Sequence, residues 1–365
     1  MARLAEAAFH GGHKVTYLVV GKSLLSEVKN KASIWGIARL FCRSSTEIEE
    51  IGIDTGGSLT ETIDFKVIPV LPKGFPRVLR RYVARRYQKV SALLTRYVVG
   101  SELVIVESGY ALFYAGELMR QLPSARFVYR MSDDIELFFK SPELHEEEEK
   151  ISGNFHLISI PSHRLAAKKA LGGSNVTVQP HGVPRSIVGV VKEPSRGSKE
   201  KKKNIAVLGG TLGDQWVINA IAARGDCLLH VFSKLKPNMS RNVRYYGEVE
   251  LEEAVPTLRE CDIGLCHYKK IAGSEYLAET SNKTLIYTVL GLAIVLPEHA
   301  NPGWGNCFPY IVGDLDSLNE ALNRACRFKP SHSVLRASIS EWGDVLADII
   351  CKSGVHPFES QQAKK

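Results

Sequence analysis

The sequence contains no run of about 20 uncharged apolar residues, which is the length that a membrane-spanning helix requires. Its N-terminus also lacks a cationic segment followed by an apolar run and a cleavage site, so we expect a cytoplasmic protein. The seven cysteines are scattered and none stands in a CxxC pair, which argues against a disulfide framework and against structural zinc. Cys261 and Cys266 flank a predicted strand, where we expect them to pack in the core.

The composition excludes a disordered chain and a single small domain. With 365 residues, of which 44% are hydrophobic and 24% charged, the chain is long enough to bury two cores. The formal net charge of +8 predicts an anionic partner, such as phosphate groups, nucleic acid or lipid headgroups, without choosing among them.

Strand-like runs alternate with amphipathic helical runs in both halves of the chain. This alternation is typical of parallel sheets covered by helices and predicts an α/β protein with two doubly wound domains. The predicted strands of the first half are Lys14–Val20, Leu103–Val106, Phe127–Tyr129, His156–Ile160 and Val176–Val178. Those of the second half are Asn204–Leu208, Cys227–Ser233, Val243–Tyr246, Ile263–His267 and Ala293–Leu296.

A stretch rich in Pro, Gly, Ser and Lys separates the two halves. We assign residues 1–190 to an N-terminal domain, 191–203 to an exposed linker and 204–330 to a C-terminal domain. Residues 331–365 form a C-terminal helical segment that can pack back on the N-terminal domain. Residues 4–20 are typical of a helix end, a Gly-Gly turn and the second strand of a doubly wound sheet. We therefore expect the first strand of the N-terminal domain to be missing, or the first sheet to be completed differently.

The C-terminal half contains a turn that suits a phosphate group. Gly209, Gly210 and Thr211 follow a predicted strand and precede a helix that can begin near Asp214. Glycines let backbone N–H groups approach an anion, and the following helix N-terminus presents unpaired donors. An ordinary strand-to-helix turn explains these residues equally well, because neither GxGxxG nor the Walker pattern is present.

Lys283 is more informative, because it falls in the first turn of a predicted helix. Thr280 or Ser281 can cap this helix, and Gly291 ends it. The Lys283 ammonium group is then expected to point into the crevice at the carboxyl ends of the strands, where open α/β sheets bind nucleotides. A solvated surface lysine is the alternative.

Two further residues fall at the same edge of the second predicted sheet. Glu248 follows one strand and suits a ribose hydroxyl, whereas Tyr268 follows another and suits packing beside a base or diphosphate. For Glu248, a favourable charge at a helix N-terminus is an equally good explanation.

In the N-terminal half, Ser132, Asp133 and Asp134 stand between a strand and a helix. A carboxylate there can act as a general base, but the three residues also suit a helix N-cap, and the pattern does not decide between these roles. Glu107 ends the preceding strand and can orient a group in a cleft or cap the next helix. His181 lies where two lobes should meet and can contact a ligand or serve as a hinge residue.

No acidic residue occurs between Lys73 and Gly100, and cations interleave with apolar residues there. This pattern predicts a basic amphipathic helix of the kind that lies on anionic membrane surfaces. Nucleic acid is the competing partner, but no recognition motif accompanies this segment. The cations of this membrane patch are Arg77, Arg80, Arg81, Arg85, Arg86 and Lys89.

Several blocks of sequence, and the spacings between them, resemble the membrane-associated glucuronosyltransferases of xanthan biosynthesis, which are inverting glycosyltransferases of the GT-B fold. The resemblance covers most of the chain. It implies two Rossmann-like domains facing a cleft, with Asp133 as the catalytic base. It also implies that Glu248, Tyr268, Asn282 and Lys283 bind the uridine diphosphate part of UDP-glucuronate. The blocks are VIVESG at 104–109, FVYRMSD at 127–133, HGV at 181–183, YGE at 246–248, Tyr268, and SNK at 281–283.

Three features depart from the family pattern. Asn282 stands where the family has an apolar residue, and Ile286 stands where relatives have a polar residue that contacts the nucleotide. The missing first strand and the loop after it help to form the acceptor side in the family.

The resemblance implies metal-independent, inverting transfer of glucuronate from UDP-glucuronate to a polyprenyl-diphosphate-linked oligosaccharide, at the inner face of the cytoplasmic membrane, in exopolysaccharide biosynthesis. Asp314-Leu-Asp316 fits the DxD pattern of some metal-dependent relatives, but we interpret it as a helix start capped by Asp316 or Ser317. We therefore expect no metal site and no cofactor. The alternatives are a different UDP-sugar donor and a shortened, non-catalytic nucleotide-binding paralogue, and a nucleic-acid partner is not expected.

Overall fold

The computed structural model describes residues 2–23, 48–54, 59–67, 74–139, 141–169, 175–188, 202–329 and 339–355. The chain divides into two compact units. Unit 1 comprises Met1–Pro161, Leu165–Gln179 and Gly343–Lys365, and unit 2 comprises Ser162–Arg164 and Pro180–Trp342. The predicted linker 191–203 lies outside the described residues except at its last two positions.

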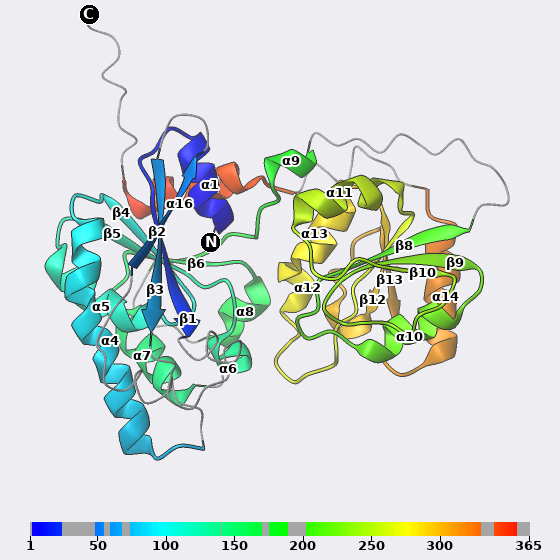
Figure 1. The fold of residues 1–365 in the computed structure, drawn as a ribbon, viewed down its shortest axis with the longest axis horizontal. Helices are drawn as coiled ribbons and strands as arrows, with labels where there is room; N and C mark the ends of the chain where they lie inside the picture. The colour runs from blue at the N-terminus through cyan, green and yellow to red at the C-terminus, as the bar shows by residue number, and fades with distance from the viewer. Residues whose placement is uncertain are drawn as a thin grey trace, which may run out of the picture. The chain divides into compact units, whose positions relative to one another are not determined.

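Unit 1 is built around a four-stranded parallel sheet with the strand order β4-β5-β6-β7. The side chains of β6, and of β5 after its first residue, are buried on both faces, which explains their continuous apolar sequence. Helix α5 packs on β4 and on helices α4 and α7 (Figure 1). The strands are β4 Leu103–Glu107, β5 Arg126–Arg130, β6 Leu157–Ile160 and β7 Val176–Val178, as the sequence predicts to within a residue at each end.

Helix α16 (Trp342–Ser353) is hydrogen-bonded to β7 and to the residue that follows it. Gln179 donates a hydrogen bond from Nε2 to Asp348 Oδ2 at 2.6 Å, and Lys352 Nζ donates to Thr177 Oγ1 at 3.1 Å. The other helices of this part of the chain are α1 Ala2–His10, α4 Arg77–Val98, α5 Leu112–Gln121, α6 Ile135–Phe138, α7 Pro142–Ser152 and α8 His163–Lys168.

A separate three-stranded sheet holds the strand that follows the Gly-Gly turn. Strand β1 (Thr16–Ser23) pairs in parallel with β3 (Leu59–Val67), which pairs antiparallel with β2 (Ile48–Asp54). The helix and the turn before β1 occur as predicted, but the prediction that this strand joins the doubly wound sheet was wrong. An apolar run indicates a strand without identifying its partner, and β2 and β3 are too rich in acidic residues to be recognised by their hydrophobicity.

Unit 2 contains a six-stranded parallel sheet with the order β10-β9-β8-β11-β12-β13. The five strands predicted here are confirmed with ends shifted by one or two residues, whereas β13 was not predicted. The strands are β8 Lys203–Leu208, β9 Cys227–Phe232, β10 Val243–Tyr245, β11 Ile263–Leu265, β12 Ala293–Pro297 and β13 Cys307–Tyr310. The helices are α9 Arg185–Val188, α10 Gln215–Ala223, α11 Leu251–Glu260, α12 Leu277–Thr280, α13 Asn282–Val289, the 3-10 helix η1 Glu298–Ala300, and α14 Leu315–Cys326.

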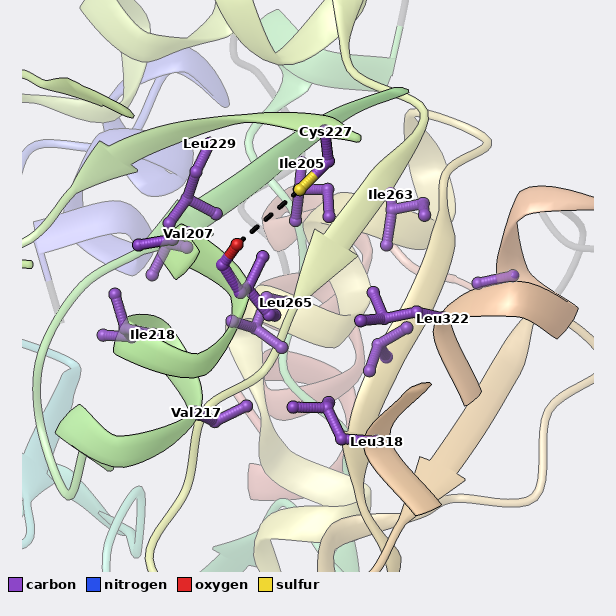
Figure 2. Close-up of a cluster of buried hydrophobic side chains, with 14 of the residues drawn as sticks. Ile205, Val207, Val217, Ile218, Cys227, Leu229, Ile263, Leu265, Leu318 and Leu322 are labelled. Atoms are coloured by element: carbon purple, nitrogen blue, oxygen red, sulfur yellow. Dashed lines mark hydrogen bonds between the residues drawn. The ribbon is translucent and has the colours of Figure 1, made fainter. Parts of the chain in front are cut away.

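The core of unit 2 joins strands β8, β9 and β11 to helices α10 and α14 (Figure 2). Cys227 belongs to this core as a free thiol, 3.8 Å from the Ile221 carbonyl oxygen. Cys261 and Cys266 are also free and buried, as the sequence predicts. This packing holds the carboxyl ends of neighbouring strands in a fixed arrangement, and those ends carry the candidate site described below. The labelled core residues are Ile205, Val207, Val217, Ile218, Cys227, Leu229, Ile263, Leu265, Leu318 and Leu322.

Gly264 in β11 lets the sheet approach helix α13 closely. A Cβ atom at this position would lie 2.3 Å from two ring atoms of Tyr287. That ring is fully buried, and its hydroxyl donates to the Ala206 carbonyl at 3.2 Å and accepts from the Leu208 N–H at 3.0 Å. The hydroxyl end of the ring is therefore fixed by two hydrogen bonds, and the buried ring has little room to move aside.

We expect Gly264→Ala to lower the free energy of unfolding by about 1–3 kcal/mol, the usual cost of overpacking a core. Chemical denaturation of the variant and the wild type measures this difference. Gly225→Ala is the matched control, because a Cβ atom there meets no atom within 4 Å. Equal midpoints for wild type and Gly264→Ala would show that the contact with Tyr287 can relax.

Candidate functional site

The turn after β8 forms the first part of the candidate site in unit 2. Gly209 adopts a φ of 59°, in the left-handed region, and its N–H donates to the Phe232 carbonyl at 2.8 Å. The turn ends at Asp214, whose side chain caps α10 by accepting from the Trp216 N–H at 3.0 Å. The helix start near Asp214 is thus confirmed, and Thr211 lies exposed in the turn before it.

Lys283 lies beside this turn. A Cβ atom on Gly209 would lie 3.4 Å from Lys283 Cε, and Lys283 Nζ lies 4.3 Å from the centre of the Tyr268 ring. The Tyr268 hydroxyl and Ser281 Oγ are hydrogen-bonded at 2.8 Å, and Ser281 Oγ also caps α13 by accepting from the Thr284 N–H. The fold therefore brings the glycine turn, the tyrosine and the lysine together.

The Lys283 ammonium group is half-buried and forms no ion pair with a carboxylate in the described part of the chain. Burial lowers its pKa from 10.5 to about 8, because the charged form loses hydration. The ring of Tyr268 supplies only the weaker attraction of an aromatic face. A desolvated cation next to glycine N–H groups is an arrangement suited to a phosphate oxygen.

His267 packs against the turn that follows β8, at Gly213, and the sequence did not single it out. It is fully buried, and a Cβ atom on Gly213 would lie 2.9 Å from its ring. Burial, and then the nearby Lys283, lower its pKa from 6.5 to about 3, so the ring is neutral and does not repel the ammonium group. Its position directly before Tyr268 was the available signal, but a histidine at a strand end is too common to single out.

The other residues predicted to bind the UDP part of the sugar donor, Glu248 and Asn282, are exposed. Glu248 follows Gly247, which has a φ of 78°, and lies before helix α11 rather than in its first turn. The helix-charge explanation for Glu248 therefore loses support. Asn282 begins α13 with its side chain exposed. Tyr246, which we had not selected, stacks on Phe232 with ring centres 4.4 Å apart and is 43% exposed.

The candidate base lies in unit 1, in the loop between β5 and α6. Ser132 Oγ donates to Glu107 Oε1 at 2.7 Å, and the Asp133 N–H donates to Ser108 Oγ at 3.0 Å. The Asp133 side chain is exposed, and its carboxylate makes no hydrogen bond or ion pair with the residues that the structure describes. Two hydrogen bonds therefore hold the backbone while the carboxylate remains available to a ligand.

Asp134 takes the capping role that the sequence left open among three residues. Its side chain is fully buried and accepts from the Glu136 N–H at 3.1 Å, so it caps α6. It also pairs with Lys168 and with Lys169, the latter at 3.2 Å. These cations lower the Asp134 pKa against the opposing effect of burial. Cap and candidate base are therefore different residues.

Glu107 does not cap the following helix. The N-cap position of α5 is Ala111, which has no side-chain cap, whereas Glu107 accepts the Ser132 hydroxyl. The surrounding protein atoms, and then the Glu107 charge, raise the pKa of Asp133 from 3.8 to about 6. An exposed carboxylate with such a pKa suits proton transfer near neutral pH.

We expect Glu107→Gln to move the acidic limb of the pH–activity profile to lower pH. On the sequence prediction that Asp133 is the base, its ionised form is the active one, so activity should fall as the pH drops through its pKa of about 6. Removing the like charge lowers the Asp133 pKa, and the variant should keep a larger fraction of its maximal rate at pH 5. Glu102→Gln, exposed at the other end of β4, is the control. If the acidic limb of the pH–activity profile stays at the same pH in Glu107→Gln, the Glu107 charge does not raise the Asp133 pKa.

His181 is buried in unit 2 against Trp342, with ring centres 5.6 Å apart. The next residues pair with the segment before α16, since the Val183 N–H donates to the Ser340 carbonyl at 3.0 Å. A Cβ atom on Gly182 would lie 2.6 Å from the Trp342 backbone nitrogen. Both roles that the sequence allows for His181, ligand contact and hinge, therefore stay predictions.

Asp314 is the N-cap of α14, and its Oδ1 accepts from the N–H groups of Asp316 and Ser317 at 3.0 Å. The helix start is confirmed, but the choice of Asp316 or Ser317 as the cap was wrong, because the aspartate two residues earlier has the extended backbone that a cap requires. Within the described ranges, no cluster of three or more His, Cys, Asp or Glu could hold a metal ion.

The membrane patch lies on α4, but several of its cations are engaged. Arg80 pairs with Glu143 at 2.7 Å, and Arg77 and Arg81 each pair with Glu146 at 3.1 Å. Arg85 is exposed, and the side chains of Arg86 and Lys89 lie outside the described residues. None of the helices in the described part of the chain combines the length and hydrophobicity that crossing a bilayer demands.

The chain is similar to a known protein family and to a curated enzyme. Residues 1–161 match the family model described as "Glucuronosyltransferase GumK, N-terminal domain". A similar curated protein, the UDP-glucuronate:glycolipid 2-beta-glucuronosyltransferase of Xanthomonas campestris pv. campestris, is 26% identical over 228 residues. This match covers 62% of the chain and 56% of that relative, so it spans little more than half of the relative's length.

Solved structures resemble the whole chain in fold. An alpha,alpha-trehalose-phosphate synthase (UDP-forming) from Burkholderia xenovorans has a TM-score of 0.62 at 12% identity, covering 93% of this chain and 99% of that one. A sucrose-phosphate synthase from Thermosynechococcus elongatus has a TM-score of 0.63 at 11% identity, covering 95% and 90%. These likenesses confirm an α/β fold of the GT-B kind with two parallel sheets. The family match over residues 1–161 confirms the resemblance to GumK-type glucuronosyltransferases that is seen in the sequence.

Proposed function

We propose that the chain is an inverting glycosyltransferase that moves glucuronate from UDP-glucuronate to a hydroxyl group of a lipid-linked oligosaccharide. The observation that carries this proposal is the half-buried Lys283 ammonium group beside Gly209 and over the Tyr268 ring. A diphosphate would supply the counter-charge that the described protein residues do not. The family and the name of the Xanthomonas relative support glucuronate as the donor sugar and a glycolipid as the acceptor.

In the proposed reaction, Asp133 accepts the proton of the acceptor hydroxyl while the hydroxyl oxygen forms a bond to the anomeric carbon. The bond from that carbon to the diphosphate oxygen breaks, and UDP leaves with the bonding electrons. Lys283 and the N–H groups of Gly210 and Thr211 stabilise the charge that develops on the diphosphate. A single displacement of this kind inverts the anomeric centre, and we expect it to proceed without a divalent cation.

A different UDP-sugar is the second candidate donor. Ile286 is buried on α13, at the position where the family carries a polar residue that contacts the nucleotide. An apolar side chain cannot make that hydrogen bond, so recognition of the nucleotide or its sugar can differ from that in relatives.

The proposal is tested by measuring UDP release from UDP-glucuronate, UDP-glucose and UDP-galacturonate, with and without a polyprenyl-diphosphate-linked oligosaccharide. We expect UDP-glucuronate to be consumed fastest, and only when acceptor is present. Faster consumption of another donor would transfer the proposal to that sugar. UDP binding without consumption of any donor would support the shortened, non-catalytic paralogue.

We further propose that the N-terminal part of α4 lies on an anionic membrane surface. Besides the arginines, this segment exposes apolar side chains on one helical face, with Val78 82% and Tyr82 53% exposed. Leu79 lies beside them on the helix, and Phe75, just before the helix begins, is exposed as well. Cations beside an exposed apolar stripe suit the boundary between headgroups and acyl chains.

We expect the double variant Arg81→Gln/Arg85→Gln to bind anionic vesicles roughly 30-fold more weakly, because each cation near such a surface contributes about 1 kcal/mol. Sedimentation with vesicles at increasing salt measures the effect. The control variant Arg241→Gln/Arg259→Gln removes two exposed cations from unit 2 and should bind as wild type does. Equal sedimentation of both variants would show that α4 is only a solvated face.

A further inference from the structure

Arg130 is a fully buried cation at the end of β5, three residues before Asp133. Its side chain has 0% exposure and is the largest of the fully buried side chains. Nη1 donates to Ser159 Oγ at 2.6 Å and to the Gln179 carbonyl oxygen at 2.7 Å. Burying a guanidinium group is costly unless charges or hydrogen bonds compensate, so a residue placed here calls for an explanation.

Glu107 is the carboxylate that faces this cation. Glu107 and Arg130 are direct partners in the register between β4 and β5, which puts their side chains on the same face of the sheet. Burial lowers the pKa of Arg130 to about 10, and the Glu107 charge opposes that shift. The two charges therefore stabilise each other in the interior at the carboxyl end of the sheet.

The backbone around Asp133 is attached to this pair. The Ser108 N–H donates to the Arg130 carbonyl at 3.1 Å, and Ser108 Oγ accepts from the Asp133 N–H at 3.0 Å. On the other side, Ser132 Oγ donates to Glu107 at 2.7 Å. A carboxylate is a strong acceptor for that hydroxyl. The loop geometry thus depends on the position in which the Glu107 side chain is held.

The guanidinium group is itself held by Gln179, the residue that directly follows β7. Gln179, whose carbonyl accepts from Arg130, is buried, and its N–H donates to the Ile160 carbonyl at 2.7 Å. Its side chain donates to Asp348 of α16 at 2.6 Å. A rigid second layer of this kind fixes the direction in which Arg130 presents its charge.

We propose that Arg130 is a positioning residue for Asp133: its buried guanidinium pairs with Glu107 on the neighbouring strand and fixes the position of that side chain, which then holds the Ser132 hydroxyl and the loop that carries the base. This inference rests on the proposed function in taking Asp133 as the base, and it goes beyond that function in naming the group that holds the base in place. Arg130 touches neither donor nor acceptor in this scheme.

The test removes the cation and then removes the charge that the cation compensates. We expect Arg130→Met to lower kcat about 10- to 100-fold while KM for UDP-glucuronate stays within about twofold, as for a misplaced catalytic group. Adding Glu107→Gln should return kcat to the level of Glu107→Gln alone, because no unmatched carboxylate remains. Arg126→Met, at the exposed start of the same strand, should behave as wild type.

A role in packing alone would not be rescued by a neutral residue at position 107. The proposal is therefore overturned if the double variant is as slow as the product of the two single effects, or if Arg130→Met keeps full kcat. If Arg130→Met does not fold, Arg130→Lys, which keeps the cation, should fold and retain more activity than the folded double variant. Equal or lower activity of Arg130→Lys would also overturn the proposal.

Hydrogen exchange of the segment 127–135 provides a readout that needs no turnover. Exchange at the Asp133 amide should accelerate in Arg130→Met and return toward wild type in the double variant. If exchange follows this pattern while wild type consumes no donor, the proposed function fails and the positioning role stands. If wild type transfers glucuronate and exchange is unchanged in Arg130→Met, the positioning role fails and the function stands.

Discussion

Asp133→Asn should abolish measurable transfer, lowering kcat about 100- to 10,000-fold, while the Kd for UDP changes less than about twofold. General-base catalysis contributes rate factors of this size, and asparagine cannot accept the proton. The substitution keeps the shape of the side chain and the backbone N–H that donates to Ser108 Oγ, so the loop should not move. Initial rates with saturating acceptor, together with calorimetry of UDP, measure the two effects separately.

Glu136→Gln is the control for this experiment, because it neutralises an exposed carboxylate three residues along the chain. It should leave both kcat and UDP affinity unchanged. Transfer by Asp133→Asn at more than about a tenth of the wild-type rate would exclude Asp133 as the base. A parallel loss of UDP binding would instead assign Asp133 to the donor site.

Lys283→Ala should weaken UDP binding by about 1.5–3 kcal/mol, which corresponds to roughly a 10- to 150-fold increase in Kd. The expected loss is large because the ammonium group is half-buried, so water only partly replaces it. Isothermal titration of UDP into the variant measures this loss. Lys270→Ala, which removes an exposed cation two residues after Tyr268, should change the Kd less than about twofold.

The pH dependence of the wild type provides an independent check on Lys283. Its pKa of about 8 means that the ammonium form is lost as the pH rises through 8. UDP affinity should therefore fall above pH 8, and binding near pH 8 should take up protons because the bound diphosphate favours the charged form. Lys283→Ala should lack both effects. Unchanged affinity in Lys283→Ala, or proton uptake that survives the substitution, would remove Lys283 from the diphosphate site.

The strands of unit 2 were accessible from the sequence because parallel strands buried on both faces form short, continuous apolar runs. Strand β13 was missed because Pro309 interrupts a run of only four residues. In unit 1, β2 and β3 carry acidic residues in alternation with apolar ones, and a hydrophobic signal is weak there. Local sequence also located the caps of α10 and α13, since a cap is formed by residues within a single turn.

The contacts that define the candidate site lie outside the reach of local pattern. The local pattern did not show which of Ser132, Asp133 and Asp134 caps the helix. The structure shows that Asp134 is the buried carboxylate, because Lys168 and Lys169 pair with it. Likewise, Arg130 directly follows the predicted strand Phe127–Tyr129, and an arginine is usually exposed. Its partner Gln179 is 49 residues away, and no periodicity links the two.

The most direct test of the central claim is transfer of radiolabelled glucuronate from UDP-glucuronate to a polyprenyl-diphosphate-linked oligosaccharide by the purified chain, followed by glycosidase digestion of the labelled lipid. UDP-glucuronate carries an α-linked sugar, so single displacement by an acceptor activated by Asp133 predicts a β-linked product. The label should enter the lipid fraction and be released by a β-glucuronidase. Label that enters the lipid but is released only by an α-glucuronidase, or no labelled lipid from a protein that binds UDP, would contradict the account.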